Sequence, residues 1–290
     1  MRFAVEWRMP LLHLQANTMT LFRTALASAL LFASAAAGAH DFAAYTEAST
    51  QLAQRTAEAV KLHRMPRASD PAVGKLIATM SDDKRFLGGA AFRAEDLPGV
   101  MEMCDAANRA NMAYIMFDLG SYVDKSMNDR PLRVATITQK VMAKNALMFQ
   151  DEMALLTSFG QRCLSREVVL LADFVKTLKP EQMTGVRLEG LAQVRRGIYT
   201  GYVGTATAAN ATAVSLDNRK KMFDAMAEVA PVFAEVLEPA ERKKIRDFAL
   251  ATKAKVPREL SAQLQQIIDA MGITRCEDLC RYSTQAAPAQ

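Results

Sequence analysis

Arg195, Tyr199 and Tyr202 come closest to forming a binding site in this sequence. They follow one another at steps of four and three residues, so one face of a helix would present all three side chains. A guanidinium beside two phenol rings can bind an anionic or aromatic ligand, because it offers charge, hydrogen bonds and flat apolar surface. The same pattern also suits a helix whose tyrosines simply pack inward. We treat the three residues as a candidate ligand-binding site.

Acidic residues that could act in general acid–base catalysis occur in two places. Glu102 and Asp105 share a helix face with Arg109, a spacing typical of surface ion pairs. Asp151 and Glu152 interrupt an apolar seam, and burial would shift the pKa of either side chain. Neither place brings a base to a nucleophile, so no catalytic residue is predicted.

Histidines are too few to suggest a metal site. Beyond the N-terminal region the chain carries only His40 and His63, and about 35 Å of one predicted helix separates them. A processed N-terminus at His40 could offer an amine and an imidazole to Cu(II), but His63 cannot complete that site. Phosphate-binding glycine loops and nucleophile-elbow motifs are also missing from the sequence. We predict neither a metal nor a cofactor, and an enzymatic role is not favoured.

The N-terminal region is typical of an export signal. Arg23 precedes the short apolar run 25–37, and Ala37-Gly38-Ala39 fits a small-residue cleavage site. Cleavage after Ala39 would make His40 the first residue of the mature chain. Residues 1–18 do not suit a leader, so Met19 is a better start than Met1. We therefore expect a leader and signal peptide over 1–39 and a periplasmic or secreted protein.

Four cysteines remain after this cleavage: Cys104, Cys163, Cys276 and Cys280. An even number in an exported protein predicts two disulfides. Four residues on a regular helix separate Cys276 and Cys280 too widely for an easy bond. The spacing thus favours bonds from this tail to Cys104 and Cys163. A non-helical tail would instead allow the local bond.

Helical periodicity dominates the rest of the chain and predicts an all-α fold. Two long helices are expected, over 97–125 and 132–161, and the second carries two adjacent apolar seams. A third helix, about 181–214, carries small residues on one stripe: Gly197, Gly201, Gly204, Ala208, Ala211 and Ser215. Small side chains let another backbone approach closely, so we expect this helix at the centre of an irregular, disulfide-tied bundle.

Composition and charge limit the partners. The full chain has a formal net charge of +5, which is too weak to indicate nucleic-acid binding. Glycines spaced along an apolar segment also occur where membrane helices pack, but the stretch 197–216 has few large aliphatic residues, so no membrane span is expected in the mature chain.

These observations predict a single all-helical domain over 40–282 and a disordered tail over 283–290. Export, helicity and the lack of a catalytic motif favour a binding or structural module of the bacterial cell envelope. Two alternatives remain. One is an enzyme or carrier for a small apolar ligand held between helices. The other is a bundle that binds a partner protein.

Mass spectrometry of the purified mature protein tests the predicted signal cleavage and the predicted disulfides. We expect an intact mass that begins at His40 and lacks the four thiol protons of two disulfides. A chain that retains residues 19–39, or that alkylates as free thiol without reduction, would contradict the predicted processing.

Overall fold

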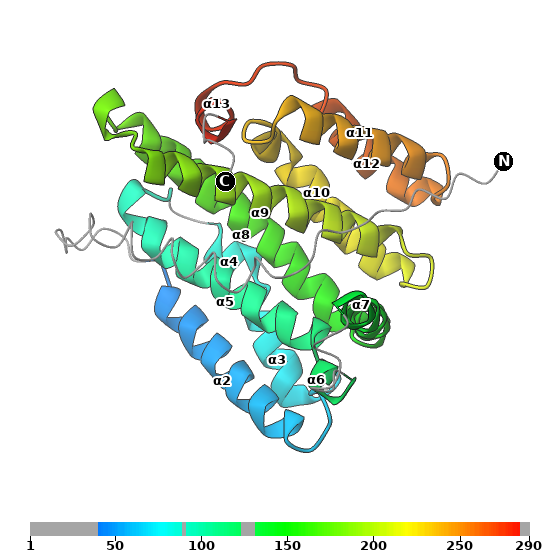
Figure 1. The fold of residues 1–290 in the computed structure, drawn as a ribbon. Helices are drawn as coiled ribbons and strands as arrows, with labels where there is room; N and C mark the ends of the chain where they lie inside the picture. The colour runs from blue at the N-terminus through cyan, green and yellow to red at the C-terminus, as the bar shows by residue number, and fades with distance from the viewer. Residues whose placement is uncertain (1–39, 89–90, 123–130, 285–290) are drawn as a thin grey trace.

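The computed structural model describes residues 40–88, 91–122 and 131–284, so the predicted leader and most of the predicted tail lie outside it. The described residues form helices and no β-strand, which confirms the all-α class (Figure 1). Short 3₁₀ turns at Ala94–Asp96, Pro180–Gln182 and Arg258–Leu260 lie in the connections. The α-helices are α2 (Phe42–Val60), α3 (Pro71–Met80), α4 (Asp83–Phe86), α5 (Leu97–Ile115), α6 (Leu119–Tyr122), α7 (Pro131–Met148), α8 (Gln150–Lys176), α9 (Gly185–Asn210), α10 (Leu216–Ala234), α11 (Pro239–Lys253), α12 (Ser261–Ala270) and α13 (Asp278–Thr284).

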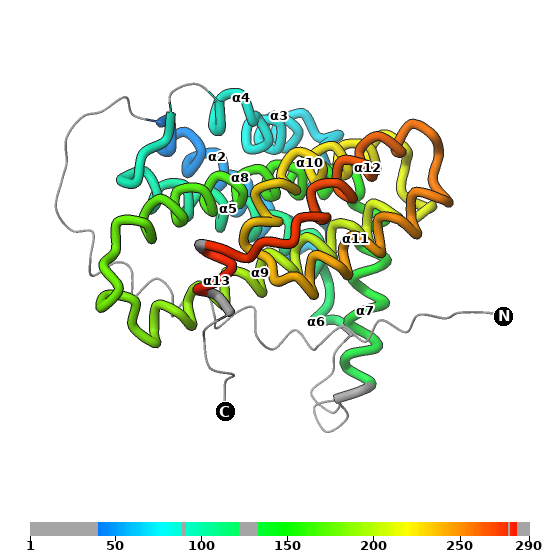
Figure 2. The backbone as a smooth tube through the Cα atoms, turned by 90° about the horizontal axis from the view of Figure 1, so that it is seen from above, coloured from blue at the N-terminus to red at the C-terminus, as the bar shows by residue number. Residues whose placement is uncertain are grey.

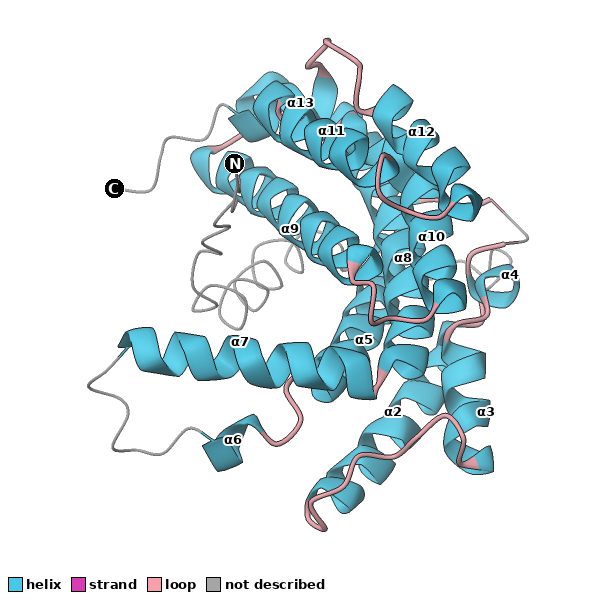
Figure 3. Ribbon diagram, turned by 90° about the vertical axis from the view of Figure 1, so that its right-hand side faces the viewer, coloured by secondary structure: helices cyan, strands magenta, loops and turns pink. Residues whose placement is uncertain are grey.

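Helix α8 occupies the middle of the molecule, with α5 packed along one side and α10 along another (Figures 1 and 3). Phe159 and Leu170 of α8 join a hydrophobic cluster with α2, α3 and α5. Ala154, Val168 and Leu171 of the same helix join a second cluster with helices α9 to α13. One helix thus belongs to both halves of the core, and neither half can separate without exposing it to water.

Local signals explain several helix ends. Asp41 accepts a hydrogen bond from the Ala44 amide at the start of α2, and Ser215 accepts one from the Asn218 amide at the start of α10. Pro71 stands in the first turn of α3, where its missing N–H costs nothing. These caps supply partners for backbone amides that have none inside a helix.

The long helix predicted over 132–161 is in fact two helices, α7 and α8, divided at Phe149. Phe149 has φ −112° and ψ 29°, and its buried ring meets the rings of Tyr114 and Phe117. Just before it, Asn145 Nδ2 donates to the carbonyl of Ile115, the last residue of α5, and to that of Phe117 beyond the helix. Tertiary contacts therefore redirect the chain here, and α7 extends away from the other helices beside α6 (Figures 2 and 3).

The glycine stripe of α9 faces away from the core. Gly197, Gly201 and Gly204 are exposed, and a Cβ added to any of them would meet no described atom within 4 Å. The buried face of α9 instead carries larger residues such as Ile198 and Tyr202. Our expectation that a neighbouring backbone packs on this stripe is therefore wrong for these three glycines, whereas Ala208 and Ala211 of the same stripe are half-buried against the core. No described helix is both long and apolar enough to cross a membrane.

Two disulfides tie the helices, but not in the pairing we favoured. Cys104 of α5 bonds to Cys163 of α8, with 5.4 Å between their Cα atoms. Cys276 bonds to Cys280, with 5.2 Å between Cα atoms. The local bond forms because Cys276 precedes the first residue of α13, so the two cysteines do not sit at regular helical spacing.

A buried arginine closes the end of α10. Arg242, 1 % exposed, donates from Nη1 to the Ala234 carbonyl at 2.7 Å and from Nη2 to the Arg275 carbonyl at 2.8 Å. Arg219 does the same for α9, where its Nε donates to the Ala209 carbonyl at 2.8 Å. The last carbonyls of a helix lack partners and carry partial negative charge. A cation therefore stabilises the C-terminal ends of both α9 and α10.

Replacing this buried cation should destabilise the fold markedly. Arg242→Met keeps an apolar stem but removes the donor from the buried Ala234 carbonyl and from the partly buried Arg275 carbonyl, and we expect a loss of about 2 to 4 kcal/mol in the free energy of unfolding. Urea denaturation followed by circular dichroism measures it. Lys243→Met, at the exposed neighbouring position, is the matched control and should cost under about 0.5 kcal/mol. Equal losses in both variants would refute the capping role.

Candidate functional site

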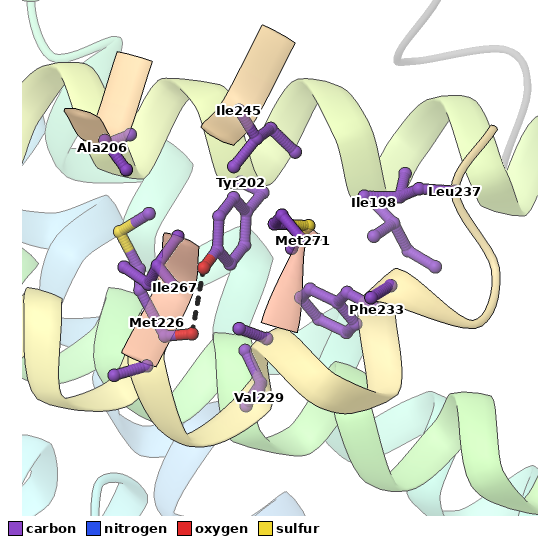
Figure 4. Packing of buried hydrophobic residues seen from close by; sticks show 14 of the residues in the cluster. Ile198, Tyr202, Ala206, Met226, Val229, Phe233, Leu237, Ile245, Ile267 and Met271 are labelled. Carbon is purple, nitrogen blue, oxygen red and sulfur yellow. Dashed lines mark hydrogen bonds between the residues drawn. The ribbon is translucent and has the colours of Figure 1, made fainter. Parts of the chain in front are cut away.

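The three residues predicted to bind a ligand do not share a surface. Tyr202 is 0 % exposed, donates its hydroxyl to the Met226 carbonyl at 2.9 Å, and meets the ring of Phe233 edge-on (Figure 4). Burial in this apolar cluster raises the pKa of its phenol well above the usual range. Tyr202 is therefore a core residue, and it could contact a ligand only if the core repacked.

Arg195 lies on the same helix but serves an ion-pair cluster. It contacts Glu238 and Glu241, which cap the start of α11. Burial raises the pKa of Glu241, and the Arg195 charge opposes that shift. Tyr199 is half-buried, with Lys244 of α11 over its ring. The cluster thus connects α9 to α11 through polar contacts.

The acidic pair at the start of α8 also has structural partners. Glu152, 1 % exposed, accepts hydrogen bonds from Arg67 Nε at 3.0 Å and from the Ala68 amide at 2.7 Å. Asp151 accepts one from Asn218 Nδ2 at 2.6 Å. These bonds fix the segment before α3 and the start of α10 to α8.

The two histidines occupy different environments. His40 stacks on Phe92 with 3.8 Å between ring centroids, and its Nε2 lies 3.6 Å from Asp96. His63 is largely exposed in the turn after α2 and adopts a positive φ of 51°. Over the described ranges, no three His, Cys, Asp or Glu side chains gather as they would around a metal ion.

A groove between α2 and α5 is a concave feature that the sequence analysis missed. Its volume is about 300 Å³. Leu52 and Ala106 are buried at its floor. The lining residues are mostly small: Ser49, Thr50, Leu52, Ala53, Thr56 and Ala57 from α2, and Ala106, Arg109, Ala110 and Ala113 from α5. Small side chains on both helices leave space between their axes that larger ones would fill.

The signal for this groove was present in the sequence. Alanine, serine and threonine recur every three or four residues on one face of 49–57 and on one face of 106–113. Each pattern taken alone is an ordinary helix face. Only the packing of α2 beside α5 brings the two faces together.

Close to the groove, α5 and α8 carry an unusual acidic pair. Asp105 is bound by Arg109 on α5, and Glu167 lies on α8 one turn beyond Cys163. Burial, together with the charge of Asp105, raises the pKa of Glu167 to about 7. Two carboxylates that interact electrostatically resist ionising together. This contact should therefore respond to pH near neutrality.

Comparisons with known proteins assign no relative to this chain: no family model, no curated protein and no solved structure matches it.

The raised pKa of Glu167 predicts a specific dependence of stability on pH. A folded-state pKa above the unfolded value means that folding favours the protonated acid. Its contribution is therefore full below about pH 4.5 and is lost as pH rises through 7. Glu167→Gln mimics the protonated form, so it should unfold like the wild type at pH 4.5 and be more stable by about 1 to 3 kcal/mol at pH 8.

Urea denaturation across this pH range provides the measurement. Glu58→Gln, at an exposed position on α2, is the matched control and should change stability little at any pH. If the difference between Glu167→Gln and the wild type stays constant from pH 4.5 to 8, the proposed ionisation is wrong.

Proposed function

We propose that this protein is an exported binding module of the bacterial cell envelope that holds a small apolar ligand in the groove between α2 and α5. The observation that carries the proposal is the groove itself, with about 300 Å³ of space and a lining of which half the residues are alanine. This volume is at the lower end of small-molecule sites, which are concave and mostly apolar. The ligand would contact Leu52 and Ala106 at the floor.

Two features support a location outside the cytoplasm. The segment before His40 has the pattern of a cleavable export signal. The described cysteines form two disulfides, and such bonds persist mainly in oxidising compartments. A periplasmic or secreted protein fits both features.

The polar residues that we considered for chemistry make structural contacts between helices, which supports binding over catalysis. Arg195 and Glu152, which the sequence singled out for possible chemistry, hold helices together through buried or half-buried contacts. Active sites need such groups to point at a substrate, with a base near a nucleophile. We therefore propose the groove as the site of a ligand carrier, in place of the position beside Tyr199 and Tyr202 that we expected.

A role in binding a partner protein is less well supported. Large apolar side chains with substantial exposure are spread over several helices and the turn after α2: Val60, Leu62, Leu147, Met148, Val169, Val186, Leu216 and Leu250. Protein interfaces usually gather such residues into one patch. The distribution favours the groove as the place where binding occurs.

Filling the groove tests this proposal. A neutral apolar fluorophore, N-phenyl-1-naphthylamine, should bind the wild type with a rise in fluorescence. Ala53→Phe places a ring in the groove from an exposed position, and it should weaken binding at least about fivefold. Gln54→Phe adds the same ring on α2 outside the lining and should leave the affinity unchanged. Equal binding by all three proteins would rule out the groove as the site.

A further inference from the structure

The groove carries one charge. Among the described residues that line it, Arg109 is the charged one, and the others are apolar or small hydroxyl residues. Its side chain is 56 % exposed, so its stem borders the groove while its guanidinium stays accessible to water. A ligand that lies in the groove therefore has one end beside a cation.

Asp105 holds the guanidinium of Arg109 in place but uses only part of its hydrogen-bonding capacity. Asp105, one helical turn earlier, contacts its Nη1 atom. A guanidinium has five N–H donors in a planar fork, and the contact with Asp105 leaves the edge formed by Nε and Nη2. Within the described chain no other hydrogen bond to Arg109 occurs. This edge matches the two oxygens of a carboxylate.

We infer that the ligand of this groove is an anionic amphiphile, with a carboxylate on Arg109 and an aliphatic chain along the alanine walls. The inference rests on the function proposed above and adds the class of ligand. Residues 49–57 of α2 extend for about 12 Å at 1.5 Å per residue, so the chain is short, comparable to that of decanoate. Ala53, Ala57, Ala110 and Ala113 line its path.

Nearby acids limit how strongly the cation selects an anion. Asp105 neutralises part of the Arg109 charge, and Glu167 of α8 adds negative charge when it ionises. The mouth of the groove is also open to solvent, which screens the interaction. The preference for a carboxylate over an alcohol is therefore about tenfold, at the lower end of the effect of one charge-assisted hydrogen-bonded pair.

Competition between two ligands of equal length tests the inference. Decanoate and decan-1-ol each displace N-phenyl-1-naphthylamine from the wild type at pH 7.5. Decanoate binds about tenfold more tightly, and added salt reduces the difference. Arg109→Met keeps the apolar stem and removes the charge, so the two affinities become equal within about twofold. Arg55→Met, on an exposed arginine of α2 outside the groove, leaves the tenfold preference intact.

The outcomes separate this inference from the function on which it rests. If both ligands bind equally to the wild type, or if the preference for decanoate survives in Arg109→Met, Arg109 does not select the ligand and the inference is overturned, while the groove remains a binding site. If neither ligand displaces the probe, the proposed function fails and the inference fails with it.

Discussion

The burial of α8 on two sides is the constraint on which the rest of this structure depends. Phe159 and Leu170 enter one hydrophobic cluster, and Val168 and Leu171 enter the other. A helix that is apolar on more than one face must be covered by neighbours on each of them. The helices before and after α8 in the chain supply this cover, so their positions follow from the side chains that α8 presents.

Polar contacts along α8 make this arrangement specific. Glu152 binds the segment before α3, and Gln161 Nε2 donates to Thr205 of α9 at 2.9 Å. Arg162 pairs with Asp83 of α4 and with Glu228 of α10. Hydrophobic burial alone tolerates sliding and rotation, whereas buried or half-buried hydrogen bonds have a required geometry. These contacts therefore fix how both halves of the core lie on the same helix.

The groove arises where this packing is least complete. The Cys104–Cys163 bond holds α5 against α8, and α2 then covers the outer side of α5. Most of the residues that line the space between these two helices are alanine, serine or threonine, whose short side chains do not fill it. At the other end of the contact, Phe42 lies where a Cβ on Gly99 would come within 2.6 Å of its ring. A glycine permits close approach there, while short side chains farther along leave room for a ligand.

The sequence by itself determined the all-helical class, because apolar periodicity is a local property of each segment and because prolines and capping residues such as Pro71 and Ser215 act within one turn. It did not determine which stripe of α9 is buried. Periodicity shows that Gly197, Gly201 and Gly204 share a face, but the larger side chains of the opposite face gain more from burial. The break at Phe149, the local Cys276–Cys280 bond and the groove between α2 and α5 were likewise decided by the tertiary structure. The helix break and the groove depend on contacts between residues that are distant in the chain, and the local disulfide depends on where α13 begins. The spacing of residue types alone predicts neither long-range contacts nor the exact start of a helix.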